Sequence, residues 1–322
     1  MNDITNTPGN SPFHSPPPTL FESVSSVFQR MPAWAFVSVS LIGIFFLYQI
    51  VGGTITFLLF GMDMADSNVT IVRLATMVGQ VLFILIPTVI LAKLRFPGRT
   101  NVFRFGDFHP GQLLLVLVAV FALQQLLQGY LMLQEAVPLE LPPVVQQFVD
   151  QIKKLMEQMY RMLTSADSFP EFLFVVLVIA VTPAICEEIL FRGLIQTTLE
   201  ESGTHDGGGS RPQRGLTAAV IAGIVFGVYH LNPFTLIPLI VLGVYFGFVV
   251  YRTQNIVTSI AAHFFNNFLA CVVVYLQLDE NFIAISPDKF PDSETLLLNF
   301  ALSSVVFVAA TYYLVRITRR PA

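Results

Sequence analysis

The sequence predicts an all-α protein: a polytopic membrane helix bundle of about eight transmembrane helices, with one further amphipathic helix at the interface. Of the 322 residues, 54% are hydrophobic and only 12% are charged, and the mean hydropathy is +0.69. A soluble domain carries about twice that charged fraction. The apolar residues gather in runs of roughly 20, the length that an α-helix needs to cross the hydrocarbon layer. The 30 Phe residues also suit a surface that faces lipid.

The first 32 residues differ in composition from the rest of the chain. They are rich in Pro, Ser, Asn and Thr, and they contain no basic stretch followed by an apolar core. A secretory signal peptide requires that pattern. Segments with so few apolar residues bury too little surface to fold. We therefore expect residues 1–32 to form a disordered cytoplasmic tail.

Eight apolar runs follow, and each is expected to form one membrane helix. They cover residues 34–60, 72–93, 111–134, 169–198, 216–231, 234–251, 256–276 and 295–315. These runs divide the chain into N-terminal transmembrane helices (33–135), an extracytoplasmic segment (136–168), a central helical core (169–276), and a last loop, helix and basic C-terminal tail (277–322).

The loop charges orient the bundle, because Lys and Arg concentrate on the cytoplasmic side of membrane proteins. Basic residues follow the second, fourth, sixth and eighth helices, whereas two of the intervening loops are acidic. Eight spans with both termini in the cytoplasm place these basic loops on one side, in the plasma (inner) membrane if the source is bacterial. Lys153, Lys154 and Arg161, in the third outer loop, are the exception.

That third outer loop is expected to contain an amphipathic helix. Apolar residues recur at helical spacing through residues 137–165, with charged residues between them. Such a pattern is typical of a helix that lies on a membrane surface. It would either pack on the bundle as an interfacial helix, which we favour, or gate the lateral entry of a substrate.

Ionisable side chains within membrane spans are costly, so each one is a functional hypothesis. The fourth span carries Glu187, Glu188 and Arg192. Glu188 and Arg192 are four residues apart and can pair on one helix face. Glu187 is rotated by about 100° and keeps its carboxylate free. Pro183 lies one turn earlier, where it removes a backbone hydrogen bond and favours a kink.

Two further clusters lie on other spans at i, i+4 spacing, Phe226 with His230 and His263 with Asn267. Glu187 lies 13 residues before the end of its helix at Glu200, and His230 lies 14 residues after the start of the next at Leu216. At 1.5 Å per residue, both are about 20 Å from the tip of the hairpin that joins these helices. His263 and Asn267 lie about 10–16 Å in from the same cytoplasmic side. If the hairpin projects a turn or two into the cytoplasm, all four residues reach a similar depth, and a shared cavity is expected.

These three motifs, EExxxR, FxxxH and HxxxN on separate membrane helices, resemble those of the CAAX prenyl endopeptidase and bacteriocin-processing (CPBP, or Abi) family of intramembrane proteases. The resemblance covers residues 169–276, about a third of the chain. It implies that Glu187 and His230 activate a water for attack on a peptide bond, and that His263 and Asn267 stabilise the oxyanion. It also implies orienting roles for Glu188, Arg192 and Phe226.

The residues do not decide whether the protein uses a metal cofactor. The family is also described as metalloproteases, and Glu187, His230 and His263 would be a plausible zinc set. They come from three separate helices, however, and no HExxH pair is present. We favour a glutamate mechanism without a metal.

Two other classes of function remain open: a transporter-like proton relay, and a scaffold that binds peptides without cutting them. Buried Glu, His and Arg would serve a relay equally well, but the sequence contains no inverted repeat of the kind that transporters use. Cys186 is expected to be a small packing residue. The expected partners are a membrane-associated peptide or lipidated protein and the bilayer. The net charge of −4 gives no indication of nucleic acid.

Overall fold

The computed structural model describes residues 19–61, 68–107, 109–137, 141–202, 211–278 and 293–318, and all secondary structure within these ranges is helical. The α-helices are α1 (Leu20–Arg30), α2 (Ala33–Phe45), α3 (Gly53–Phe60), α4 (Val69–Gln80), α5 (Ile86–Arg95), α6 (Pro110–Ala136), α7 (Pro143–Thr164), α8 (Phe169–Val175), α9 (Thr182–Glu188), α10 (Thr197–Ser202), α11 (Arg211–Tyr229), α12 (Leu236–Thr253), α13 (Ile256–Tyr275) and α14 (Ser293–Ile317). Wider π-helical segments join α2 to α3 (Phe46–Gly52), α4 to α5 (Val81–Leu85), α8 to α9 (Val176–Val181) and α9 to α10 (Ile189–Gln196).

The prediction of a polytopic membrane bundle is confirmed. Seven helices of the described ranges are long and apolar enough to span a membrane: residues 33–59, 69–95, 110–136, 169–201, 236–253, 256–275 and 294–317. The expected span over residues 216–231 corresponds to α11, whose apolar part, Gln213–Tyr229, is shorter than the other seven.

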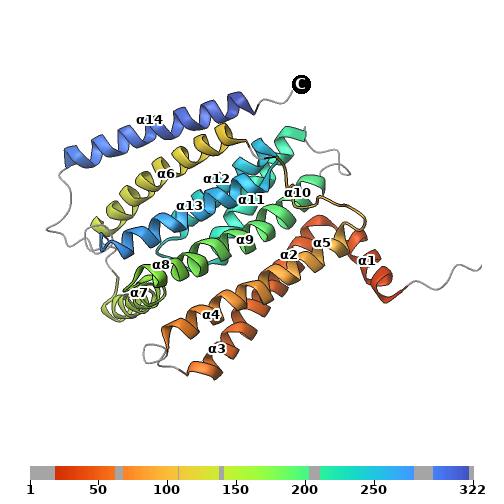
Figure 1. Cartoon of the computed structure of the whole chain (residues 1–322), viewed down its shortest axis with the longest axis horizontal. Coiled ribbons are helices and arrows are strands. Elements are labelled where there is room, and N and C mark those ends of the chain that lie inside the picture. Colours follow the sequence, from red (N-terminus) through yellow and green to blue (C-terminus); the bar gives the residue numbers. More distant parts are fainter. Residues whose placement is uncertain are drawn as a thin grey trace, which may run out of the picture.

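The membrane-spanning helices lie roughly parallel or antiparallel in layers, whereas α7 is seen end-on and crosses them (Figure 1). Helix α6 lies between α14 on one side and α12 and α13 on the other. The long helix made of α8, α9 and α10 lies in the middle of the bundle, and α2 to α5 form a layer on its far side. The central helix is consequently enclosed: 61% of its most apolar window is buried, against 11% for α14.

The central helix carries Glu187 and Glu188 on its short α-helical stretch, α9, between two π-helical segments. Threonines mark the end of each segment, because their hydroxyls donate to carbonyls five residues earlier, Thr182 to Leu177 at 2.8 Å and Thr197 to Arg192 at 3.4 Å. π-Helical turns are rare and occur often at functional sites. Each π-helical turn rotates the residues that follow it about the helix axis. The helix face on which a side chain lies therefore differs from the face expected for a regular α-helix.

The α11–α12 hairpin packs with its backbones in contact. A Cβ atom added to Gly223 would lie 2.3 Å from the backbone nitrogen of Val244, and one added to Gly243 would lie 2.7 Å from the carbonyl oxygen of Gly223. Small residues allow membrane helices to approach this closely. The tight packing holds His230, which follows the end of α11, at a fixed position against the rest of the bundle.

The expectation of a disordered tail over residues 1–32 was wrong for residues 20–30, which form α1; residues 1–18 lie outside the described ranges. Thr19 and Glu22 form a capping box at its start, in which the Thr19 hydroxyl accepts from the Glu22 backbone and Glu22 accepts from the Thr19 backbone at 2.7 Å. The Ser25 hydroxyl donates to the carbonyl of Leu94 at 2.8 Å. The composition of the Pro- and Ser-rich start concealed this short amphipathic helix.

The capping box responds to acid. Hydrogen bonds from the Thr19 backbone and side chain lower the pKa of Glu22 below its usual range. A carboxyl group whose pKa is lower in the folded state stabilises that state at higher pH and loses the contribution as the pH falls through the folded-state pKa. The start of α1 therefore weakens in acid.

The amphipathic helix expected in the third outer loop is α7, and a buried arginine holds its C-terminal end. The guanidinium group of Arg73, only 1% exposed, donates to the carbonyls of Met162 and Leu163 at 3.0 Å each and to that of Ser165. It also pairs with Glu171 at 2.6 Å. Basic groups that bind the last carbonyls of a helix stabilise its end. Arg73 was missed by sequence reasoning, although a lone arginine near the start of an apolar span was a usable signal.

Replacing Arg73 by Met is expected to destabilise the protein by about 2–3 kcal/mol, because three carbonyls and a carboxylate lose their donor. Thermal unfolding in detergent, together with limited proteolysis of α7, measures the effect. The matched control is Arg161→Met, which removes an exposed i, i+4 pair with Glu157 at 3.7 Å, a kind of pair that contributes little. Equal losses for the two variants would contradict the prediction.

Candidate active site

Glu188 is fully buried and lies at the centre of a network that joins three helices. Its carboxylate accepts from Arg192 at 2.6 Å, from the Ser259 hydroxyl at 2.5 Å and from Nδ1 of His263 at 3.0 Å. Arg192, also fully buried, donates from its other terminal nitrogen to the carbonyl of Gly243 at 2.7 Å. The expected Glu188–Arg192 pair is therefore present, and it ties α13 and α12 to the central helix.

Aromatic rings enclose this ion pair. The guanidinium carbon of Arg192 lies 4.7 Å from the centre of the Phe226 ring and 5.5 Å from that of Phe246. Phe226 also packs against His230 at 4.6 Å and against His263 at 5.8 Å, and Phe246 stacks on His263 at 5.3 Å. A cation over an aromatic face is attracted by the negative charge of that face. Phe226 thus supports Arg192 and both histidines at once.

Glu187 lies beside the two histidines; its side chain is 17% exposed, but its Oε2 atom is buried. Its Oε2 lies 3.7 Å from Nε2 of His230 and 4.0 Å from Nε2 of His263. Both separations are too long for direct hydrogen bonds. Within the described part of the chain, Oε2 of Glu187 accepts no hydrogen bond. One carboxylate oxygen and two imidazole nitrogens therefore converge, as the depths of the three residues in their helices predicted.

Hydrogen bonds at the far side of each ring determine which nitrogen carries a proton. Nδ1 of His230 lies 2.7 Å from the carbonyl oxygen of Phe226. A carbonyl can only accept, so Nδ1 is the donor. Nδ1 of His263 likewise faces the carboxylate of Glu188. The Nε2 atom of each ring is thereby turned toward Glu187, and in the neutral ring of His230 it is free to accept a proton.

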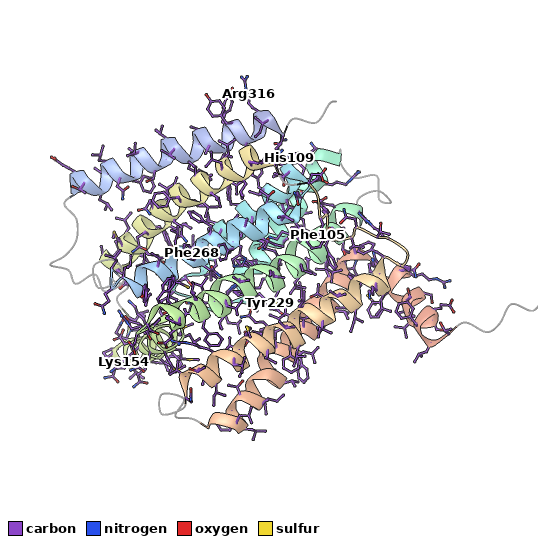
Figure 2. All side chains as sticks on the ribbon, viewed as in Figure 1. Phe105, His109, Lys154, Tyr229, Phe268 and Arg316 are labelled. Atoms are coloured by element: carbon purple, nitrogen blue, oxygen red, sulfur yellow. The ribbon has the colours of Figure 1, made fainter. Side chains whose placement is uncertain are left out.

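Tyr229 fixes α11 against the N-terminal helices beside this site. Its ring packs edge-on against Phe45 and Phe191, each at 5.5 Å, and its hydroxyl donates to the carbonyl of Leu41 at 3.4 Å. Figure 2 shows Tyr229 in the interior of the bundle, next to the central helix. The layer of α2 to α5 therefore borders the site, a role that the sequence did not indicate.

Comparison with known proteins supplies the class of the domain. Residues 169–269 match the model of the type II CAAX prenyl endopeptidase Rce1-like family. This segment is therefore similar to CAAX prenyl proteases. No curated protein and no solved structure matches the chain significantly. This CAAX protease domain contains all the residues named above on α9, α11 and α13. The match covers about a third of the chain, and it is to a family of peptidases.

Asn267 of the CAAX protease domain makes its hydrogen bonds away from Glu187. Its Nδ2 donates to the carbonyl of Ile179 at 3.0 Å, and its Oδ1 accepts from Asn266 at 3.0 Å. Ile179 lies four residues before Pro183, which has no N–H to bond that carbonyl. The Asn267 amide therefore joins α13 to the central helix one turn before Pro183. Its second N–H has no assigned partner in the described ranges.

Ser259 and Phe246 are the supporting residues of the CAAX protease domain that sequence reasoning missed. Ser259 could have been found, because it is a polar residue one helical turn before His263 on the same face of α13. Phe246 and the carbonyl of Gly243 carried no signal, since phenylalanines and glycines occur throughout the spans. Cys186, which we expected to be a packing residue, is 1% exposed and belongs to an apolar cluster with Phe36 and Leu190.

The proposed zinc set requires a separate test of fit. Zinc bound by His and Glu at about 2.0–2.2 Å needs three donors that face a common point at that distance. In the part of the chain that the structure describes, no group of three or more His, Cys, Asp or Glu side chains is placed to hold a metal ion. Glu187, His230 and His263 converge but do not form such a group as they are arranged. Metal dependence stays a prediction for a chelator experiment.

Proposed function

We propose that the protein is a CAAX-type intramembrane endopeptidase in which Glu187 and His230 activate a water molecule without a metal ion. The observation that carries this proposal is the convergence of Glu187 Oε2 with Nε2 of His230, at 3.7 Å, and with Nε2 of His263, at 4.0 Å. A separation of this size between two polar atoms suits a bridging water. The substrates would be membrane-associated peptides or lipidated proteins.

In the first step, Glu187 acts as the general base. Its carboxylate takes a proton from the water, and the resulting hydroxide attacks the carbonyl carbon of the scissile bond. Nε2 of His230 accepts a hydrogen bond from the same water and orients it, because its Nδ1 proton is held by the carbonyl of Phe226. A positioned base of this kind contributes about 10²–10⁴-fold to the rate.

The tetrahedral intermediate carries a negative charge on the former carbonyl oxygen. Nε2 of His263 and the second N–H of Asn267 would donate to this oxyanion. Because Nδ1 of His263 already donates to Glu188, a second donation from the ring requires the imidazolium form, and Glu188 lies beside that charge. Collapse of the intermediate then returns the proton from Glu187 to the leaving amine.

The experiment that tests this function is cleavage of farnesylated and unmodified peptides by the detergent-purified protein, with and without a zinc chelator. His230→Gln is compared with His109→Gln, because His109 is exposed and lies outside the site. We expect cleavage that resists the chelator and is lost only in His230→Gln. Chelator sensitivity that zinc reverses would replace the metal-free mechanism with a metal mechanism. Failure to cleave any peptide would favour a proton relay or a peptide-binding scaffold.

Asn267 has two proposed roles, as a donor to the carbonyl of Ile179 and as a donor to the oxyanion. A second substitution, at Pro183, distinguishes them. Asn267→Ala is expected to lower the free energy of unfolding by about 1–2 kcal/mol, because the carbonyl of Ile179 loses its donor. It should also slow cleavage by about 10²-fold through loss of an oxyanion donor. In the double variant with Pro183→Ala, position 183 regains a backbone N–H, which bonds that carbonyl when the segment takes the α-helical i, i+4 register. Stability should then recover whereas cleavage stays low.

Thermal unfolding and kcat are measured for Asn267→Ala, Pro183→Ala and the double variant. Pro183→Ala alone is the control, since it adds a donor while Asn267 keeps its own. Recovery of both stability and kcat in the double variant would show that Asn267 acts only by capping the carbonyl, and would remove it from the proposed oxyanion site.

A further inference from the structure

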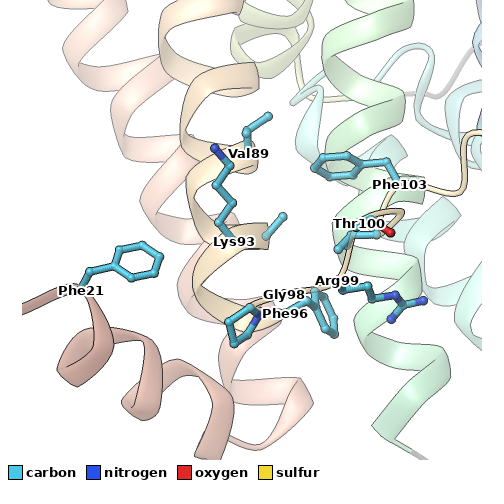
Figure 3. A pocket seen from close by; sticks show the side chains of 11 residues that line it. Phe21, Val89, Lys93, Phe96, Gly98, Arg99, Thr100 and Phe103 are labelled. Carbon is cyan, nitrogen blue, oxygen red and sulfur yellow. The ribbon is translucent and has the colours of Figure 1, made fainter. Parts of the chain in front are cut away.

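A cavity lies outside the candidate active site, between α1, α5 and the segment 96–103 (Figure 3). Its volume is about 360 Å³. Most of its lining is apolar, and the lining residues are Phe21, Val89, Ala92, Lys93, Phe96, Pro97, Gly98, Arg99, Thr100, Val102 and Phe103. None of the residues assigned to peptide hydrolysis lines it.

Two cationic side chains line this cavity, and only one of them has an assigned anionic partner. Arg99 pairs with Glu201. Lys93 is exposed and forms no ion pair with any residue in the described ranges. Figure 3 shows its side chain extending along α5 toward Val89, at the wall of the cavity. Lys93 lies in the last turn of α5, and a long lysine side chain near the end of a span can extend to the headgroup region.

The position of the cavity along the bundle is that of a membrane interface. One side of the cavity is formed by Phe21 of α1. Helix α1 is amphipathic, and its apolar residues Leu20, Phe21 and Val27 are exposed. Such helices lie in the headgroup region of a bilayer. The last turn of α5 and the segment that follows also carry Arg95, which donates to carbonyls at the end of α1, and Arg104, which pairs with Glu200.

We propose that this cavity binds an anionic phospholipid, with an acyl chain along its apolar wall and the phosphate at Lys93. The charge and the apolar lining carry the proposal together. Basic pockets between membrane helices at an interface bind anionic lipid headgroups, and each buried methylene of an acyl chain adds to the binding. A neutral ligand would gain nothing from the Lys93 charge, and a simple anion would leave the apolar wall uncovered.

The cavity wall also contacts the central helix. A Cβ atom added to Gly193 would lie 2.6 Å from the Phe103 ring, so Phe103 packs directly on the π-helical segment that follows Glu188. The next residue, Arg104, pairs with Glu200 at 2.8 Å and donates to Thr197 at 3.0 Å. A lipid against Phe103 would therefore stabilise the helix that carries Glu187.

The test is thermal unfolding of delipidated protein in neutral detergent, titrated with phosphatidylglycerol or phosphatidylcholine. We expect phosphatidylglycerol to raise the unfolding temperature at lower concentration than phosphatidylcholine. Lys93→Gln should weaken the apparent affinity for phosphatidylglycerol about fivefold, which is the effect of one basic group near an anionic lipid. Val89→Phe, which fills the cavity, should weaken the binding of both lipids. Lys154→Gln on α7, at the opposite end of the bundle (Figure 2), is the control.

Three outcomes would overturn the proposal. Equal stabilisation by the two lipids would show that the phosphate charge does not matter. Lys93→Gln and Lys154→Gln with the same affinity for phosphatidylglycerol would place the lipid elsewhere. Displacement of phosphatidylglycerol by a farnesylated peptide, and not by the unmodified peptide, would assign the cavity to the substrate. Each result is independent of whether the protein cleaves peptides.

Discussion

Glutamine in place of Glu187 is expected to reduce peptide cleavage by about 10³-fold or more while leaving the fold intact. The amide has the same shape as the carboxylate but cannot take the proton of the attacking water. The fold should tolerate the change, because Oε2 of Glu187 accepts no hydrogen bond from the described residues and the side chain is partly exposed. An effect on kcat without an effect on unfolding is the signature of a residue that acts on the reaction itself.

The measurement is kcat/KM for a fluorogenic peptide, with thermal unfolding of the same preparations. Glu157→Gln is the matched control, since that carboxylate is exposed and lies on α7, outside the site. Cleavage by Glu187→Gln within tenfold of the unaltered protein would exclude Glu187 as the base. Loss of both cleavage and thermal stability would instead indicate a structural role.

The second large effect is expected from Arg192→Met. The guanidinium and Glu188 are both fully buried, and the substitution leaves the carboxylate without its ionic partner. Breaking a buried pair in this way costs about 3–5 kcal/mol, more than the pair itself contributes to stability. Cleavage should fall as well, because Glu188 also binds the ring of His263. Arg192 therefore affects catalysis indirectly, because it holds Glu188, which in turn positions the ring of His263.

A double variant separates charge from packing. In Arg192→Met with Glu188→Leu no charge is left unpaired, so part of the lost stability should return. Cleavage should not return, because His263 has lost its hydrogen-bond acceptor. Arg316→Met is the control, since Arg316 lies in the last turn of α14 and donates to the exposed Tyr312. If Arg192→Met unfolds at the same temperature as Arg316→Met, the buried pair is not needed for stability.

Hydrophobic run length and residue spacing are sufficient to predict much of this protein. Apolar runs of about 20 residues indicate membrane helices, because a bilayer allows few other backbone arrangements. The i, i+4 spacing of Glu188 and Arg192 predicted their ion pair, and the depth of Glu187 and His230 in a helical hairpin predicted that they would meet. Each of these inferences depends on geometry within one helix or across one hairpin.

Only the tertiary structure decided how the helices turn toward one another. Packing at Gly223 and Gly243 sets the rotation of α11 and α12, and no periodicity encodes which carbonyl then faces Arg192. The acceptor of the Asn267 amide, the carbonyl of Ile179, depends on an α13 contact far along the chain. The hydrogen bonds from Arg73 to the last carbonyls of α7 likewise join residues that are far apart in the sequence. The sequence by itself determined which polar groups are in the membrane and how deep they lie, whereas packing between helices determined which partner each of them binds.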